Sequence, residues 1–372
     1  MAFKDIEVVL YDGHIKVNYT DASHRYQARP RVLNEDGSFK LPEDNPKAWG
    51  KALFPKGTTT LLGDTLEKKG LQRYPLSKML MYAFGFYEFT DDNGEKKMGY
   101  SKHGVASFFD PETGRLHDWT KEEALEHISY ASKADLRWTD KGASIGSVVH
   151  DAIENFVKGN PDFNIHDKYA ESLQAAAQAE FGTRAGFESE KALQQALDEY
   201  GEDTWHAELA YEQFVKWWNA TKPELLGAED LIYSKTHNIC GTFDGLLRIK
   251  GKGVVLADWK TSNASTSESA CMPEGINYQY FLQSAIYAMA WMEMGREKID
   301  DLLIVSCRKD GGFTTIFASD LGLTVDQCIN WARAVIVCKR MMETTKEALW
   351  QHGIESGAVV KKVSSRAKKV AA

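Results

Sequence analysis

The chain has 372 residues, of which 43% are hydrophobic and 26% charged, and its formal net charge is −8 at pH 7. This profile predicts a soluble globular protein with more than one domain, or with one core and long insertions. The absence of a run of about 18 apolar residues argues against a membrane span. The five cysteines contain no Cys-x-x-Cys pair, which argues against disulfide, zinc and iron–sulfur frameworks. With no secretory signal pattern at the start, we expect a cytoplasmic protein of a bacterial or phage-infected cell.

Residues 1–140 are expected to form an N-terminal extension of strands followed by helices. Two β-type runs at 6–11 and 15–19 flank an Asp12-Gly13 turn, which is typical of a hairpin. Residues 31–58 are rich in Pro, Gly, Asn and Asp and therefore predict a loop. Helical patterns follow from Thr58 onward, with a second helix at 76–81.

Helical periodicity resumes from 121 to 156, and an Ala-, Gln- and Glu-rich helical insertion is expected at 160–200. Beyond Pro223, the pattern predicts strands, a helix, a hairpin and a final helix, at 228–234, 239–249, 253–260, 277–295, 302–317 and 324–350. This order predicts an α/β fold, with a central mixed β-sheet flanked by helices.

The tripeptide Asp258-Trp259-Lys260 follows an apolar strand at 254–257. Because strand side chains alternate, Asp258 and Lys260 should project from one face. A hairpin turn at 250–253 would bring Asp244 alongside them. Two neighbouring carboxylates repel each other unless a cation neutralises them, and clustered carboxylates suit Mg²⁺ or Mn²⁺. The sequence therefore predicts a metal-dependent reaction on a phosphate-like substrate.

Three further features, on five residues, have both a structural and a functional interpretation. His150 shares a helical stripe with Gly146 and Glu154, and a histidine on a helix is either a structural residue or a ligand. Glu229 precedes the Asp244 strand and could equally be a solvated edge residue. Gln279, Gln283 and Tyr287 form an uncharged polar stripe on one helix, which is less typical of a solvent-exposed face.

Taken together, these motifs resemble the RecB-type branch of the PD-(D/E)xK nucleases. The matching motifs are Gly146-x-x-x-His150, Gly241-Thr-Phe-Asp244, Asp258-Trp-Lys260 and Gln283-x-x-x-Tyr287, with Glu229 on the expected strand. The resemblance covers residues 141–320 and implies a restriction-endonuclease-like core that carries the 160–200 insertion. Residues 321–372 would then form a C-terminal helix and a basic tail.

The resemblance also implies roles for individual residues. His150, Asp244, Asp258 and the Trp259 carbonyl would bind Mg²⁺ or Mn²⁺, and Glu229 would assist the metal. Lys260 would orient and help to deprotonate the attacking water, or offset charge on the phosphate, while Gln283 and Tyr287 would hold Lys260 or the phosphate. The expected substrate-binding residues are Gln279, Thr261, Ser262 and Lys78.

The function that the resemblance implies is a metal-dependent deoxyribonuclease, an exonuclease on DNA ends or single strands in replication, recombination or repair. Two alternatives stay open: a structure-specific or flap endonuclease, and a non-catalytic nucleic-acid-binding subunit. The expected partners are DNA and either a replication or recombination protein or further copies of the chain, without a membrane. The N-terminal extension could guide DNA, and the basic residues at 361–369 are either a disordered tail or a DNA contact.

Overall fold

The computed structural model describes residues 5–20, 25–65, 86–90, 96–100, 134–160, 163–167, 190–262 and 276–356. Four expected features lie outside these described residues. They are Lys78, the helix at 76–81, most of the 160–200 insertion and the basic residues at 361–369.

A six-stranded mixed sheet forms the centre of the molecule, in the order β11-β10-β9-β8-β4, with β7 also paired to β8. Its strands are β4 (Lys56–Gly57), β7 (Glu224–Ser234), β8 (Ile239–Ile249), β9 (Gly253–Ser262), β10 (Asp301–Arg308) and β11 (Phe313–Phe317). The pairs β9–β10 and β4–β8 are parallel, whereas β7–β8, β8–β9 and β10–β11 are antiparallel. The prediction of a mixed sheet is therefore confirmed.

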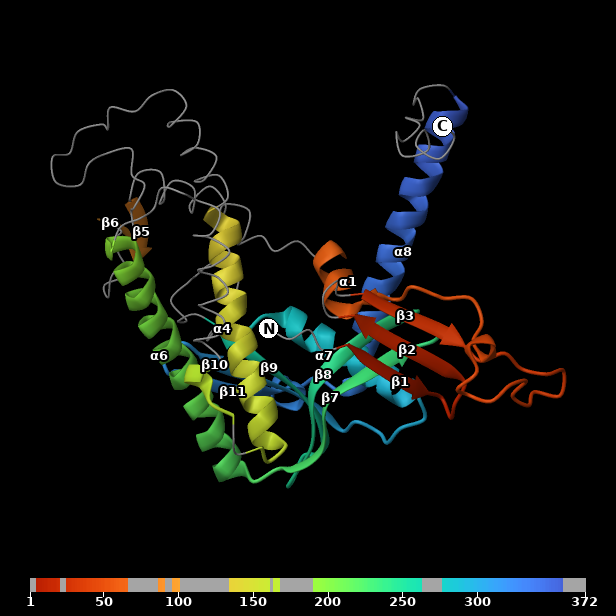
Figure 1. Ribbon diagram of the computed structural model, residues 1–372, viewed down its shortest axis with the longest axis horizontal. Helices are drawn as coiled ribbons and strands as arrows, with labels where there is room; N and C mark the ends of the chain where they lie inside the picture. Colours follow the sequence, from red (N-terminus) through yellow and green to blue (C-terminus); the bar gives the residue numbers. More distant parts are fainter. Residues whose placement is uncertain are drawn as a thin grey trace.

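Helices cover both faces of this sheet (Figure 1). They are α1 (Thr58–Thr65), α4 (Ala134–Val157), α6 (Glu190–Thr221), α7 (Tyr278–Glu293) and α8 (Val325–Glu355). On β9, Val255 and Trp259 pack into the core beneath α4 and α6, whereas Val254 and Leu256 pack into the core beneath α7 and α8. This alternation along an apolar strand places Asp258 on the α7 side of the sheet.

The N-terminal strands form a separate three-stranded antiparallel sheet that consists of β1 (Ile6–Leu10), β2 (Ile15–Thr20) and β3 (Arg25–Pro30). Its apolar face packs against β7 and β8 through a buried cluster that joins Val17 and Ala28 to Leu231 and Tyr233 (Figure 1). The hairpin predicted around Asp12-Gly13 is confirmed. A second hairpin pairs β5 (Phe86–Thr90) with β6 (Lys96–Tyr100).

Two elements are longer than the sequence pattern predicted. The end of the expected insertion and the aromatic segment after it form one helix, α6, which ends at Thr221, just before Pro223 removes an amide donor. Strand β7 begins at Glu224 rather than 228 and contains an irregularity between Leu225 and Gly227. No helix among the described residues is long and apolar enough to cross a membrane.

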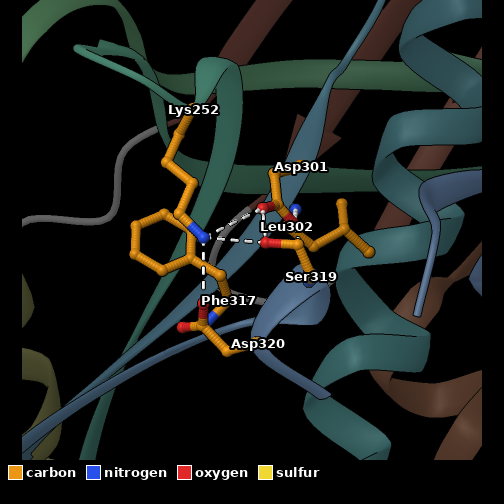
Figure 2. A network of polar contacts seen from close by, with 6 residues as sticks. All are labelled: Lys252, Asp301, Leu302, Phe317, Ser319 and Asp320. Carbon is orange, nitrogen blue, oxygen red and sulfur yellow. Dashed lines mark hydrogen bonds and ion pairs between the residues drawn. The ribbon is translucent and has the colours of Figure 1, made fainter. Parts of the chain in front are cut away.

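A closed polar cluster fixes the start of β9 to β10 and to the short 3-10 helix η5 (Ala318–Leu321) (Figure 2). Lys252 Nζ lies 2.8 Å from Ser319 Oγ and 2.9 Å from Asp320 Oδ1, and 4.1 Å from the centre of the Phe317 ring. Asp301 accepts hydrogen bonds from the Ser319 hydroxyl and from main-chain N–H groups. Each charged group in this cluster therefore has protein partners.

Candidate active site

The candidate site lies where β8 and β9 diverge. Strand β9 pairs with β8 only as far as Ala257, opposite Gly245, yet it continues beside β10 to Ser262. The same edge of β8 pairs with β4 only at 239–240, so the described ladder leaves residues 241–244 without a strand on that side. Asp244 spans the gap, because the Trp259 N–H donates to its Oδ2 over 2.6 Å.

Two glycines on either side of Asp244 allow large side chains to approach the backbone of β8. A Cβ at position 241 would lie 2.4 Å from the Tyr287 ring, and a Cβ at position 245 would lie 2.5 Å from the Trp259 ring. Both distances are far shorter than any van der Waals contact, so only glycine fits. The spacing of the Gly241-Thr-Phe-Asp-Gly245 segment is thus required by packing around the carboxylate.

Helix α7 supports the Asp258–Lys260 pair from below. Lys260 Nζ lies 2.7 Å from Asp258 Oδ2, and the Asp258 side chain is only 1% exposed. Gln283 Nε2 is 3.3 Å from Asp258 Oδ1 and 3.0 Å from the Tyr287 hydroxyl. The Tyr280 ring centre lies 5.2 Å from Lys260 Nζ, within the range of a cation–π contact. Gln283 therefore contacts Asp258, whereas the resemblance suggested that it holds Lys260 or a phosphate.

On the other side of the gap, His150 from α4, Glu229 from β7 and Asp244 from β8 bring one potential ligand atom each within 4.8 Å of one another. His150 Nδ1 lies 3.9 Å from Asp244 Oδ2. Glu229 has a φ of 56°, a left-handed conformation that costs a non-glycine residue about 1–2 kcal/mol. The potential metal ligands beside His150 are thus Glu229 and Asp244. The ligands expected from the sequence were Asp244 and Asp258, with Glu229 only assisting the metal.

The acidic groups of the site are poorly compensated by the protein. Burial, reinforced by Asp244, raises the pKa of Asp258 to about 6 despite the nearby Lys260. Burial also raises the pKa of Asp244. For Lys260, burial disfavours the ammonium, but Asp258 and Asp244 outweigh it, so its pKa is raised and it stays charged at neutral pH. One lysine cannot balance the charges of two neighbouring carboxylates, Asp244 and Asp258.

The His150 imidazole is a candidate neutral ligand. Burial, followed by the Lys260 charge, lowers the pKa of His150 below its ordinary value, while 29% of the side chain remains exposed. A neutral imidazole next to carboxylates is a suitable donor set for a divalent cation. The residues present therefore fit the metal that the sequence predicted.

A cleft of about 470 Å³ opens above these groups and is lined by Gly146, Ser147, His150, Asp151, Glu154, Glu229, Asp244, Lys260 and Thr261. Of the expected substrate-binding residues, Thr261 lines the cleft, but Ser262 does not and lies with its Oγ 3.3 Å from Ser306 Oγ. Gln279 is 6% exposed and also lies outside the lining. Ser147, Asp151 and Tyr280 were not among the residues predicted from the sequence, although the first two are helical neighbours of the Gly146–His150 stripe.

The profile of the PD-(D/E)XK nuclease superfamily matches residues 127–357. The match spans more than half of the chain and contains the helix α4, the divergent strands β8 and β9, and α7. The chain belongs to the PD-(D/E)XK nuclease superfamily.

No curated protein matches the chain. Among solved structures, the crystal structure of SSO0001 matches with 14% sequence identity and a TM-score of 0.22. The match covers 44% of this chain and 69% of the SSO0001 chain.

Proposed function

We propose that the protein is a metal-dependent deoxyribonuclease of the RecB-like branch, an exonuclease on DNA ends or single strands in replication, recombination or repair. The observation that carries the proposal is the pair of neighbouring aspartates at the strand divergence, Asp258, which is buried, and Asp244, whose side chain is 11% exposed. The pKa values of both are raised by burial, and the cleft above them also contains His150 and Glu229. Such a pair favours the binding of a cation.

His150, Glu229 and Asp244 would hold Mg²⁺ or Mn²⁺, with Asp258 and the Trp259 carbonyl as further candidates. When bound, the metal lowers the pKa of water and stabilises negative charge on the phosphate. The donor atoms come from α4, β7, β8 and β9, so the fold itself keeps them together.

In the proposed reaction, water forms a new P–O bond and releases a proton, while the ester P–O bond breaks and the leaving oxygen takes up a proton. Lys260 remains an ammonium because Asp258 and Asp244 raise its pKa, so its role is to orient the water and to offset phosphate charge. Gln283 and Tyr287 act as positioning residues. Gln283 donates hydrogen bonds to Asp258 and to the Tyr287 hydroxyl, and the Asp258 carboxylate in turn holds the Lys260 ammonium in an ion pair.

The exonuclease mode is supported by the resemblance of the Gly-x-x-x-His, Gly-x-x-Asp, Asp-x-Lys and Gln-x-x-x-Tyr motifs to the RecB-type branch. The structure adds a physical reason for the last motif. Tyr287 packs against Gly241 and accepts a hydrogen bond from Gln283, so the helix motif supports both aspartates.

The test uses purified full-length protein and end-labelled DNA in single-stranded, double-stranded, linear and circular forms, with Mg²⁺, Mn²⁺ or EDTA. Wild type is compared with Asp258→Asn and Lys260→Ala. Asp167→Asn, an exposed aspartate outside the cleft lining, is the matched control. Binding of Mn²⁺ by calorimetry gives a readout that does not depend on turnover.

We expect cleavage of linear DNA that requires the metal, loss of cleavage in both site variants, and full activity in the control. Cleavage that persists in EDTA or in both site variants would refute the mechanism. Cleavage of circular DNA would replace the exonuclease with an endonuclease. Retention of DNA on a gel without cleavage would favour a binding subunit.

A further inference from the structure

Helix α7 contacts Lys260 as well as its ion-pair partner Asp258. The Tyr280 ring centre lies 5.2 Å from Lys260 Nζ, and Gln283 Nε2 lies 3.3 Å from Asp258 Oδ1. Residues that are three apart on a helix lie on the same face. One face of α7 therefore contacts both members of the ion pair, and Tyr280 extends the Gln283-x-x-x-Tyr287 motif by one turn toward the start of the helix.

The start of α7 fixes the position of Tyr280. Asn277 caps the helix: its side chain accepts the Gln279 N–H over 2.9 Å, and its carbonyl accepts the Tyr280 N–H over 3.0 Å. The Tyr280 side chain is half-buried and packs against the apolar cluster beneath α7 and α8. The ring beside Lys260 is thus held by a capped helix and by the core.

The Lys260 side chain needs such a contact because it is long and flexible. Its ammonium ends a flexible four-carbon stem, and the side chain is 19% exposed where it lines the cleft. Two carboxylates attract the ammonium, Asp258 at 2.7 Å and Asp244 through its charge. A divalent cation would compete for these carboxylates and would repel the ammonium. The face of an aromatic ring attracts an ammonium without a carboxylate, so a cation would not compete for the contact with Tyr280.

We infer that Tyr280 is a positioning residue, which uses the face of its ring to hold the Lys260 ammonium in place for the reaction. This inference rests on the proposed function and deepens it, because Tyr280 belongs neither to the motifs found in the sequence nor to the lining of the cleft. Without the ring, Lys260 can adopt other rotamers and leave the reacting phosphate. Turnover then falls, while DNA and Mn²⁺ are still bound.

The experiment compares wild type with Tyr280→Phe, Tyr280→Leu, Tyr280→Met and Tyr278→Leu in steady-state cleavage of linear single-stranded DNA with Mn²⁺. Leu and Met remove the ring at position 280 but keep an apolar side chain against the core. Tyr278 is the matched control, because it lies two residues earlier on the same helix and its ring stacks on that of Trp331, with 5.9 Å between the ring centres. Thermal unfolding shows whether each variant is folded.

A second measurement requires neither DNA nor metal. The Lys260 amine is labelled with acetic anhydride in EDTA, and the extent of labelling is read by peptide mass spectrometry. The Leu and Met variants at position 280 should label Lys260 faster than wild type, because they leave the ammonium more exposed and less stabilised. Tyr280→Phe and Tyr278→Leu should label Lys260 at the wild-type rate.

In the cleavage assay, Tyr280→Leu and Tyr280→Met should lower kcat by about 5- to 30-fold, with KM and the Kd for Mn²⁺ changed less than about twofold. Tyr280→Phe should keep at least about half of the wild-type kcat, because it retains the ring. In a Lys260→Ala background, Tyr280→Leu should lower kcat no further, because the two side chains act as a unit.

Three results would overturn the inference while the proposed function stands: an unchanged kcat in the Leu and Met variants, an equal loss in Tyr280→Phe, or an equal loss in Tyr278→Leu. If wild type neither binds nor cleaves DNA, the proposed function falls. The labelling of Lys260 still decides in that case whether Tyr280 holds the ammonium, and equal labelling in all variants would show that it does not.

Discussion

Strand β9 has a lysine among aspartates at each of its ends. Lys252 lies beside Asp301 and Asp320 at the start, and Lys260 lies beside Asp258 and Asp244 about 26 Å away. At the start, hydroxyl and main-chain donors complete the partners of the acids (Figure 2). The end of the strand has fewer donors for its acids, and it faces a cleft.

The pKa shifts have opposite signs at the two ends. The hydrogen bond from Lys252 lowers the pKa of Asp320, whereas burial raises the pKa of Asp258 to about 6. A carboxyl group whose ionised form the protein stabilises is typical of a structural role. A carboxyl group whose ionised form the protein destabilises is typical of a functional site that binds a cation. The sign of the pKa shift therefore distinguishes the cluster around Lys252 from the cluster around Lys260, although both contain one lysine and two aspartates.

The largest expected effect is at the end of β9, around Asp244, Asp258 and Lys260. Asp244→Asn removes the carboxylate shared by the Trp259 N–H and the group around His150. We expect kcat/KM to fall by about 10³-fold or more, because a charge that stabilises the transition state is lost. Cleavage of end-labelled DNA measures this, and Mn²⁺ binding should weaken in parallel. A loss below tenfold would mean that Asp244 is not part of the chemistry.

Substitutions at the start of β9, around Lys252 and Asp301, should lower the stability of the protein and leave its activity unchanged. Asp301→Ala removes the acceptor of the Leu302 and Ser319 N–H groups and of the Ser319 hydroxyl. We expect a loss of about 3 kcal/mol in the free energy of unfolding, because buried donors are left unsatisfied. Urea denaturation measures the loss. Specific activity per folded molecule should match wild type, and a fall in activity comparable to that of Asp244→Asn would abolish the distinction between the two ends.

The two ends also differ in how far the sequence predicted them. The motifs around Asp244, Asp258 and Lys260 were readable, because alternation along β9 and the hairpin turn fix which side chains meet. Glu229 was expected only to assist the metal, on the strength of the resemblance, and its place beside His150 and Asp244 goes with a left-handed backbone that the sequence pattern does not predict. The burial of Gln279 depends on how α7 packs, which periodicity alone does not settle. The closed cluster was not predicted, because its members come from a turn, a strand and a 3-10 helix far apart in sequence.

Two glycines test whether packing or substrate access explains the site. Gly245→Ala would place a Cβ 2.5 Å from the Trp259 ring, so we expect a loss of stability of about 1–3 kcal/mol. Gly146→Ala, inside helix α4, meets only Thr261, at 4.0 Å, so it should raise the stability by about 0.5–1 kcal/mol. Because Gly146 lines the cleft, its added methyl group should raise KM for DNA. Thermal unfolding and cleavage assays on both variants separate these effects, and equal stability losses would contradict the geometry.

The smallest effect is a difference in the pH dependence of stability without metal. The pKa of Asp258 is raised in the fold, so its ionisation favours unfolding: the cost appears as pH rises through about 4 to 6 and is fully present above. In EDTA, Asp258→Asn should therefore gain stability relative to wild type as the pH rises from about 4 to about 7.5.

Asp320→Asn should show the opposite sign. The pKa of Asp320 is lowered, so its contribution is present at pH 7.5 and is lost as pH falls through its ordinary range. Asp320 lies in a half-exposed ion pair, which limits the expected loss at pH 7.5 to a few tenths of a kcal/mol. Urea midpoints at the two pH values measure both variants. If the two respond with the same sign, the contrast between the ends of β9 does not reflect their electrostatics. If the signs differ, adding Mn²⁺ should stabilise wild type and leave Asp258→Asn less affected, because the cation removes the cost that the substitution has already relieved.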